Sequence, residues 1–188
     1  MTPFVTLALQ PPEWQSLDQA ALPERVRDWL GFAGSLTERL GHVTGQAVTV
    51  DILTEVLGEP WIDEGPALAL DRLRGWLREI YLCAGGEAKI FGRTFIPMHT
   101  LEALNPRLDQ LGETPLGHVL FQLPGLKRRD LQVARLDARH RLYQRAVKGL
   151  EAMPCRLWAR RSIFEIRNLP LLVTEVFLPG SPIYENEA

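Results

Sequence analysis

The chain has 188 residues, of which 46% are hydrophobic and 23% are charged, and its formal net charge is −2. This size and composition are typical of one globular domain with its own core. A net charge so close to zero gives no electrostatic reason to expect nucleic acid or an anionic membrane as a partner. The longest apolar runs are far shorter than the ~20 residues of a membrane-spanning helix, and the N-terminus lacks the basic start of a signal peptide. We therefore expect a cytoplasmic protein without membrane insertion.

Two short helices are expected before the first strand. Residues 22–32 carry apolar side chains on one helical stripe. Residues 35–40 follow directly and begin with a capping box, in which Ser35 is paired with Glu38. Because Gly34 separates the two segments, the pattern predicts a helical hairpin or a flap.

The rest of the chain predicts a sheet with helices inserted between its strands. Six segments have the alternation or apolar content of strands: residues 46–56, 75–83, 88–97, 129–137, 155–168 and 171–179. Helical patterns cover 99–112, 114–123 and 138–152, residues 58–71 indicate a loop, and turns are expected at 84–87 and at 168–170. Strands and helices do not alternate strictly, so the order favours an α+β class with an antiparallel sheet.

Two of the predicted strands carry charges among apolar residues. In "GWLREIYLC" the alternation of a strand puts Arg78 on one face and Glu79 on the other. In "LLVTEVFLP" the charge is Glu175. An unpaired charge inside a protein costs several kcal/mol, on the order of 3–5, so each of these groups needs a partner.

The residues alone leave two interpretations of these charges open. The first is a structural salt bridge between strands, for example of Arg78 or Arg161 with Glu175. The second is a deep pocket, in which Arg78 binds a carboxylate with two hydrogen bonds and Glu175 accepts a hydrogen bond from a ligand hydroxyl. Glu79 is expected in an ion pair on the other face, with Arg93 or Arg160. Gly92, in the middle of its strand, predicts a bulge or a close approach.

Motifs for cofactor and metal chemistry are missing from the sequence. The four histidines have no metal-ligand spacing, and there is no phosphate-binding loop, paired-cysteine motif or nucleophile elbow. We therefore expect no nucleotide cofactor, no metal and no serine nucleophile. Cys83 and Cys155 are expected as reduced thiols, although a bridge between them stays open at this point.

Several blocks of the sequence together resemble the chorismate pyruvate-lyase family of bacterial ubiquinone biosynthesis. The blocks are "WLGFAGSLTERL", "WLREIYLCAGGE", "GRTFIP", "LGETPLG", "LWARRS" and "LLVTEVFLP", in the order of the family, over about residues 28–184. The resemblance implies cofactor-independent elimination of pyruvate from chorismate to give 4-hydroxybenzoate. It also implies that residues 1–188 form one domain, with an antiparallel sheet of about six strands and two helical flaps over an internal ligand cavity.

The same resemblance implies which residues meet the ligand. They are Leu36, Arg78, Leu116 and Glu175. From the chemistry of the reaction we expect Arg78 and Glu175 as the catalytic pair, and Arg93 as a donor that supports charge on the ether oxygen. The flap residues of the family act largely through their backbone, and position 36 is often Met there. Two mechanisms are open: transfer of the C4 hydrogen within a cyclic array of the substrate, or its removal by Glu175 as general base.

Residues 138–155 are expected to be an insertion that compact family members lack. A surface helix is the favoured interpretation, and a docking surface for a downstream membrane enzyme is the other. We expect a monomer whose partner is the small-molecule substrate, with a transient hand-off of product to a membrane prenyltransferase as a further step. Two other functions stay open: an effector-binding domain of the same fold without catalysis, and a sister enzyme that makes a different hydroxybenzoate.

Overall fold

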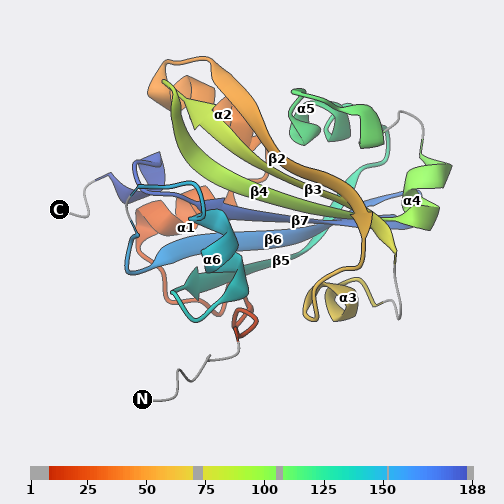
Figure 1. The fold of residues 1–188 in the computed structure, drawn as a ribbon, viewed down its shortest axis with the longest axis horizontal. Coiled ribbons are helices and arrows are strands. Elements are labelled where there is room, and N and C mark those ends of the chain that lie inside the picture. Colours follow the sequence, from red (N-terminus) through yellow and green to blue (C-terminus); the bar gives the residue numbers. More distant parts are fainter. Residues whose placement is uncertain (1–8, 70–73, 105–107, 152, 186–188) are drawn as a thin grey trace, which may run out of the picture.

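The computed structural model describes residues 9–69, 74–104, 108–151 and 153–185. Its centre is one seven-stranded sheet of order β1-β5-β6-β7-β4-β3-β2, in which every neighbouring pair is antiparallel (Figure 1). The strands are β1 Gln15–Ser16, β2 Val48–Gly58, β3 Gly75–Ala84, β4 Glu87–Pro97, β5 Lys127–Leu136, β6 Leu157–Ile166 and β7 Leu169–Phe177. The α+β class is confirmed, and the strand beyond the expected six is the two-residue β1.

Two tight turns set the register of the central strands. The β3–β4 turn contains Gly85 and Gly86, both with positive φ (63° and 77°), and the β6–β7 turn contains Arg167 and Asn168 with φ of 53° and 65°. Two successive residues with positive φ are typical of the hairpin turns that match strand twist. The second turn lies slightly earlier than predicted, since Pro170 is already in β7.

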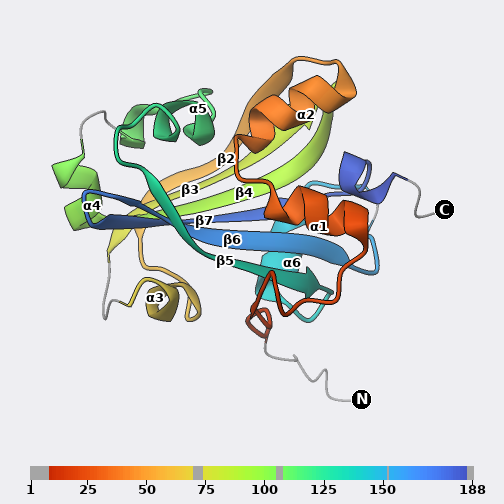
Figure 2. The same ribbon diagram turned by 180° about the vertical axis from the view of Figure 1, so that it is seen from behind.

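Helices cover both faces of this sheet (Figures 1 and 2). One face carries α1 Glu24–Gly31, α2 Leu36–Thr44 and α5 Leu116–Leu120, and the other carries α3 Glu64–Ala67 and α6 Arg141–Ala146. The helix α4 Met98–Ala103 lies at one end of the sheet against β3, β4 and β7. Two short 3-10 helices, η1 Leu108–Gln110 and η2 Pro182–Tyr184, complete the described elements.

Three predicted segments differ from the structure. The predicted loop 58–71 contains α3, and the last strand residue before it is Gly58. The predicted helix 99–112 ends early, because Leu104 is extended (ψ 130°), and η1 follows as a separate element. The predicted helix 138–152 is six residues long. Each prediction used the residue pattern alone. Tertiary contacts override the intrinsic preference of a short segment, and they do so most at its ends. Residues 70–73, 105–107 and 152 of these segments lie outside the described residues.

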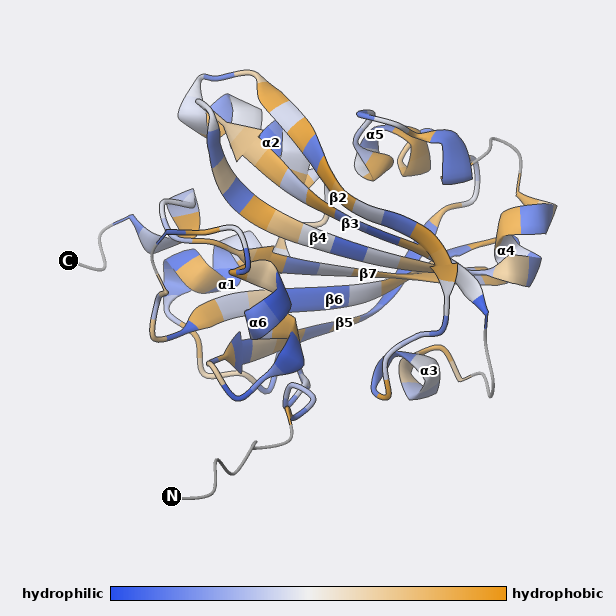
Figure 3. Cartoon of the chain, viewed as in Figure 1, coloured by the Kyte–Doolittle hydropathy of each residue, from blue (hydrophilic) through white to orange (hydrophobic). Residues whose placement is uncertain are grey.

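Hydrophobic and hydrophilic bands alternate along β3 and β4 (Figure 3), as expected for strands whose two faces differ. On the face under α1, α2 and α5 the apolar residues form two separate clusters. One joins α1 and α2 to β3, β4 and β7, for example through Leu40, Ile80 and Phe177. The other joins α5 and η1 to the far part of β4, β6 and β7, for example through Leu120 and Phe164. A pocket lined partly by polar side chains lies between these two clusters.

Candidate functional site

A central cavity lies between the sheet and the N-terminal ends of two helices, α2 and α5. Its lining comes from four strands of the sheet and from the segments where the two helices begin. Four strands supply its floor and walls, with Arg78, Ile80, Leu82, Ile90, Gly92, Thr94, Arg160, Phe164, Val173 and Glu175. The helices supply the cover, with Gly34, Ser35, Leu36, Thr37, Pro115, Leu116, Gly117, Leu120 and Phe121. The predicted arrangement of two helical flaps over an internal cavity is confirmed.

Arg78 is held at one end of this cavity with hydrogen-bonding capacity to spare. The residue is 2% exposed, and its Nη2 donates to the carbonyl oxygens of Gly112 (2.7 Å) and Thr114 (3.2 Å). Its Nη1 lies 3.0 Å from Oε1 of Glu55 but is not aligned for a hydrogen bond. Within the described part of the chain, Nε and Nη1 have no hydrogen-bond partner. Burial lowers the pKa of the Arg78 guanidinium, and nearby Glu55 opposes that shift.

Buried donors without partners are uncommon in proteins and costly to leave unmet. An anion in the cavity would satisfy the free Nε of Arg78, whereas Nη1 already has the Glu55 carboxylate as its ionic neighbour. Sequence analysis missed Glu55, the ionic neighbour of Arg78. The register of β2 against β3 places the two residues opposite each other, so only strand pairing could have identified the contact.

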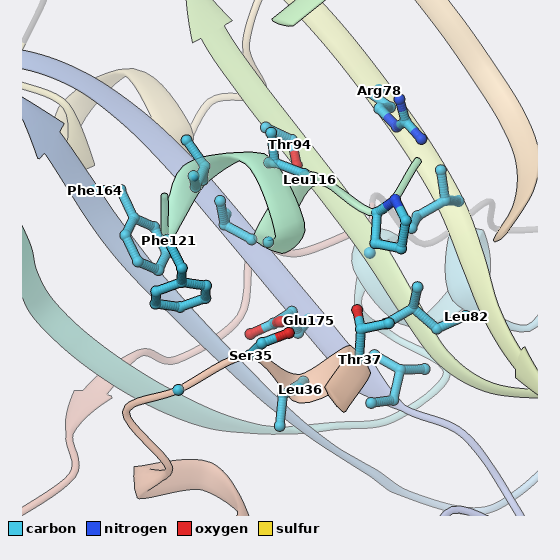
Figure 4. A pocket seen from close by; sticks show the side chains of 18 of the residues that line it. Ser35, Leu36, Thr37, Arg78, Leu82, Thr94, Leu116, Phe121, Phe164 and Glu175 are labelled. Carbon is cyan, nitrogen blue, oxygen red and sulfur yellow. The ribbon is translucent and has the colours of Figure 1, made fainter. Parts of the chain in front are cut away.

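Glu175 lies at the other end of the cavity, separate from Arg78 (Figure 4). In the sheet it stands opposite Arg160 of β6 on one side and Gly92 of β4 on the other. The Nε atom of Arg160 donates to Oε2 of Glu175 at 2.6 Å. The salt-bridge interpretation had the wrong partner, because Glu175 pairs with neither Arg78 nor Arg161. Arg161 points to the opposite face, where it contacts Gln132 and Asp63.

Gly92 leaves the floor of the cavity open beside Glu175. The predicted bulge is not at this residue, since the register of β3 with β4 is continuous there and shifts only between Leu82 and Cys83. A Cβ atom at position 92 would lie 3.1 Å from Cγ1 of Ile80. The close approach that the sequence predicted is therefore between this glycine, the side chain of Ile80 and the cavity itself.

The two flaps present the first residues of their helices to the cavity. Leu36 begins α2 directly after its N-cap Ser35, whose Oγ accepts a hydrogen bond from the backbone N–H of Glu38 at 3.3 Å. Leu116 begins α5 directly after Pro115. The first backbone N–H groups of a helix have no partner within the helix, and they favour a negative charge nearby. The cavity therefore has backbone donors in its cover and a guanidinium in its wall.

Arg93 does not belong to this site, which corrects the prediction that it supports the reaction. Its side chain projects from the opposite face of the sheet, where Nε and Nη2 donate to the two oxygens of Glu64 (2.6 and 2.9 Å). Its Nη1 donates to Oε1 of Glu79 at 2.6 Å, and the ring of Trp61 lies 3.5 Å from the guanidinium carbon. The predicted ion pair of Glu79 with Arg93 is confirmed, and the alternative pair with Arg160 is wrong.

Chemically, the central cavity suits a small ring that carries a carboxylate and a hydroxyl group. Arg78 and the flap amides can bind the carboxylate, and Glu175 can accept a hydrogen bond from the hydroxyl. The walls between them are aliphatic, with Ile80, Leu82 and Val173. The described residues contain no cluster of three or more histidine, cysteine or acidic side chains that could hold a metal ion.

The two cysteines are both free thiols. Cys155 is exposed, whereas Cys83 is buried on the face of the sheet away from the cavity, with Sγ 3.4 Å from Oδ2 of Asp51. Burial and this acidic neighbour raise the pKa of the Cys83 thiol to about 11.

Among the described helices, none is long and apolar enough to cross a bilayer.

The fold is shared with solved domains that are described as effector or ligand-binding domains. The effector domain of PhnF from Mycobacterium smegmatis superposes with a TM-score of 0.52 at 13% identity, covering 78% of this chain and 89% of that one. The ligand-binding domain of a putative GntR-family transcriptional regulator from Bordetella bronchiseptica gives a TM-score of 0.52 at 14% identity, with coverages of 72% and 85%. At such low identity the likeness concerns the fold alone.

Sequence comparison identifies the family. The family model described as chorismate lyase matches residues 8–188. The chorismate pyruvate-lyase of Hamiltonella defensa is 36% identical over 173 residues, covering 92% of this chain and 88% of that protein. The chorismate pyruvate-lyase of Salmonella arizonae is 38% identical over 165 residues, with coverages of 87% and 88%. The chain belongs to the chorismate lyase family, as its sequence blocks predicted.

Proposed function

We propose that this protein is a chorismate pyruvate-lyase, which eliminates pyruvate from chorismate and leaves 4-hydroxybenzoate for ubiquinone biosynthesis. The observation that carries the proposal is the pair of groups at the two ends of the central cavity. Arg78 has a buried Nε–H without a hydrogen-bond partner among the described residues, available for a carboxylate, and Glu175 lies at the far end as an acceptor for a hydroxyl. These are the two polar groups that chorismate and 4-hydroxybenzoate have in common.

In this proposal the ring carboxylate of chorismate lies against Arg78 and the first amides of the flaps at Leu36 and Leu116. The ring lies between the aliphatic walls, and its 4-hydroxyl donates to Glu175. This pose would give a ligand partner to the free Nε of Arg78 and to the oxygen of Glu175 that Arg160 does not contact. It would also hold the enolpyruvyl ether in one orientation, which is the main requirement for an intramolecular reaction.

The reaction breaks the bond between the ring and the ether oxygen, and it removes the hydrogen at C4, so that the ring becomes aromatic. In the cyclic version, the C4 hydrogen passes directly to the methylene carbon of the enolpyruvyl group, which leaves as pyruvate. In the general-base version, Glu175 takes the C4 proton and enolpyruvate leaves, then gains a proton to become pyruvate. We favour the cyclic version, because Oε2 of Glu175 is already held by Arg160 and the remaining oxygen suits a hydrogen-bond acceptor.

The deciding experiment is incubation of the purified protein with chorismate, followed by chromatography of the aromatic product and an enzymatic assay for pyruvate. Equal amounts of 4-hydroxybenzoate and pyruvate are expected, and Arg78→Ala serves as the site control. A different hydroxybenzoate would identify a sister enzyme. Binding of 4-hydroxybenzoate without any turnover would favour an effector-binding domain, the fold that the PhnF comparison offers.

The remaining parts of the proposal concern assembly and place. We propose a monomer that acts in the cytoplasm. Light scattering across a range of protein concentrations tests the monomer. The hand-off of 4-hydroxybenzoate to a membrane prenyltransferase and the surface role of residues 138–155 also stay proposals. Lys148→Glu, at an exposed position of this segment, tests with turnover as readout whether its surface matters for catalysis.

A further inference from the structure

A second buried arginine stands behind Glu175. Arg160 is 2% exposed, and its Nε donates to Oε2 of Glu175 at 2.6 Å. The two residues are direct partners in the register of β6 with β7, so their side chains leave the sheet on the same face. The contact occupies one carboxylate oxygen and so restricts which oxygen of Glu175 can face a ligand.

The other arm of the Arg160 guanidinium reaches the end of α1. Its Nη1 donates to the carbonyl oxygens of Phe32 (2.8 Å) and Leu30 (3.1 Å) and lies 3.4 Å from that of Trp29. These carbonyls belong to the last turn of α1, which contains no basic residue of its own. A cation at the C-terminal end of a helix satisfies its free carbonyls and the negative end of its dipole. Arg160 supplies that cation from the sheet.

A third buried arginine strengthens the same point. Arg128 donates from Nη1 to the Phe32 carbonyl at 2.7 Å, and from Nε to Oγ of Ser162 at 2.8 Å. Burial, with the repulsion of Arg160, lowers the pKa of Arg128 to about 10. Two guanidinium groups thus donate to the same carbonyl oxygen, that of Phe32. Phe32 lies three residues before Ser35, the N-cap of α2. The base of the first flap is therefore tied to the sheet at the strand that carries the partner of Glu175.

We propose that Arg160 is a positioning residue, which orients the carboxylate of Glu175 and fixes the base of the first flap relative to it. The inference rests on the proposed function, because it concerns the alignment of a ligand held by Glu175 and by the amide of Leu36. Arg160 contacts Glu175, which would hold one end of the ligand, and Phe32, at the base of the flap that would hold the other end. Movement of the flap is then confined to the chain between Phe32 and Leu36, which includes Gly34.

A double-mutant cycle tests the first half of this proposal. The variants are Arg160→Gln, Glu175→Ala and the double variant, with Arg161→Lys as the matched control on the opposite face. If Arg160 acts through Glu175, Arg160→Gln lowers kcat about 10- to 100-fold in the wild-type background. The same change costs less than about 3-fold once Glu175 is alanine, because the group to be positioned is gone. Equal losses in both backgrounds would overturn this half. Arg161→Lys should stay within about 2-fold of wild type.

The second half of the proposal, that Arg160 fixes the base of the first flap, can be tested by hydrogen exchange without substrate. Lysine at position 160 can pair with Glu175 but lacks the second arm that reaches Phe32, so it separates the flap contact from the Glu175 contact. If Arg160→Gln does not fold, Arg160→Met takes its place in the cycle, because methionine also cannot pair with Glu175. Hydrogen exchange of amides 33–38 should be about 5- to 30-fold faster in Arg160→Lys than in wild type and unchanged in Arg161→Lys. Equal exchange in the two variants would overturn the flap half. A wild-type protein that does not turn over chorismate would instead reject the proposed function and leave this exchange result valid.

Discussion

Arg93 and Arg78 are buried arginines on opposite faces of the central sheet, and they differ in how completely they are hydrogen-bonded although they lie in neighbouring strands. On the closed face, which carries Glu79 and Arg93, every nitrogen of the Arg93 guanidinium donates to a carboxylate of Glu64 or Glu79. Glu79 also accepts from Nε of Arg145 at 2.5 Å. On the cavity face, which carries Arg78 and Glu175, two nitrogens of Arg78 have no hydrogen-bond partner among the described residues.

The difference shows that burial alone does not distinguish a structural charge from a functional one. A saturated network such as that of Arg93 has no capacity left for a ligand, so its role is to stabilise the fold. An incomplete network such as that of Arg78 has a cost that a bound ligand can remove. The two faces therefore predict opposite phenotypes for substitutions of adjacent residues.

The largest expected effect is on the stability of the closed face. Arg93→Ala leaves Glu64 and Glu79 buried without their shared partner, so we expect the free energy of unfolding to fall by about 3–5 kcal/mol. Urea denaturation measures it. The control is Arg141→Ala, because Arg141 stacks on the same Trp61 ring from an exposed position. A loss below about 1 kcal/mol for Arg93→Ala would contradict the structural role of this network.

The next effect concerns activity at Arg78. Arg78→Ala should lower kcat/KM for chorismate about 100-fold, because the substrate carboxylate loses a charge-assisted pair of hydrogen bonds. Its unfolding free energy should fall by less than about 2 kcal/mol, since the ionic partner Glu55 keeps access to solvent. Steady-state kinetics with a urea titration separates the two readouts. The exposed Arg156→Ala serves as control, and normal turnover by Arg78→Ala would refute the carboxylate contact.

Glu175→Gln gives a smaller effect that sharpens the mechanism. Glutamine keeps the shape and a carbonyl acceptor but cannot remove a proton, so we expect kcat to fall by no more than about 10-fold if Glu175 only holds the hydroxyl. Single-turnover kinetics isolates the chemical step from product release. A loss of about 1,000-fold or more in that step would instead favour the general-base version.

Ser35→Ala should have a modest effect on the first flap. The change removes the N-cap hydrogen bond to Glu38, typically worth about 1 kcal/mol. Because the flap covers the cavity, we expect 4-hydroxybenzoate to dissociate up to about 5-fold faster, measured by stopped-flow fluorescence. Ser35→Asp restores a capping side chain but adds a negative charge beside the ligand, so it should recover helix stability without recovering affinity. Unchanged dissociation in both variants would argue against the flap as the exit.

The smallest expected effect concerns the reactivity of Cys83, on the closed face, toward a thiol reagent. At pH 8 the thiol of Cys83 is buried and protonated, since its pKa is raised to about 11 and only the thiolate reacts readily. A thiol reagent should therefore label Cys155 alone in the folded protein and both cysteines in urea. Labelling of Cys83 should increase as the pH approaches 11, because the thiolate fraction rises in that direction. Rapid labelling of Cys83 at pH 8 would mean that the closed face opens.

Local pattern alone predicted the strands, most helices and the separation of Arg78 from Glu79. Alternation of side chains is a property of every strand, so it assigns residues to faces before any strand pairing is known. The capping role of Ser35 and the turn at Gly85 and Gly86 were readable for the same reason, since each involves residues only a few positions apart. The sequence blocks indicated the family, and this resemblance implied that Arg78 and Glu175 share one cavity.

Most partners of the buried charges were decided by the tertiary structure, although Arg93 was one of the two partners expected for Glu79. Arg93 meets Glu64 from a segment predicted as a loop, and Glu175 meets Arg160 across a strand pair whose register depends on a distant turn. Glu55 and the carbonyl oxygens of Gly112 and Thr114 reach Arg78 from more than twenty residues away in either direction. Side-chain type and spacing determine which face of the sheet a charge occupies. Long-range strand register determines whether all of its hydrogen-bonding groups have partners there. On this sheet, a guanidinium without its full set of partners distinguishes Arg78 of the candidate site from Arg93 of the scaffold.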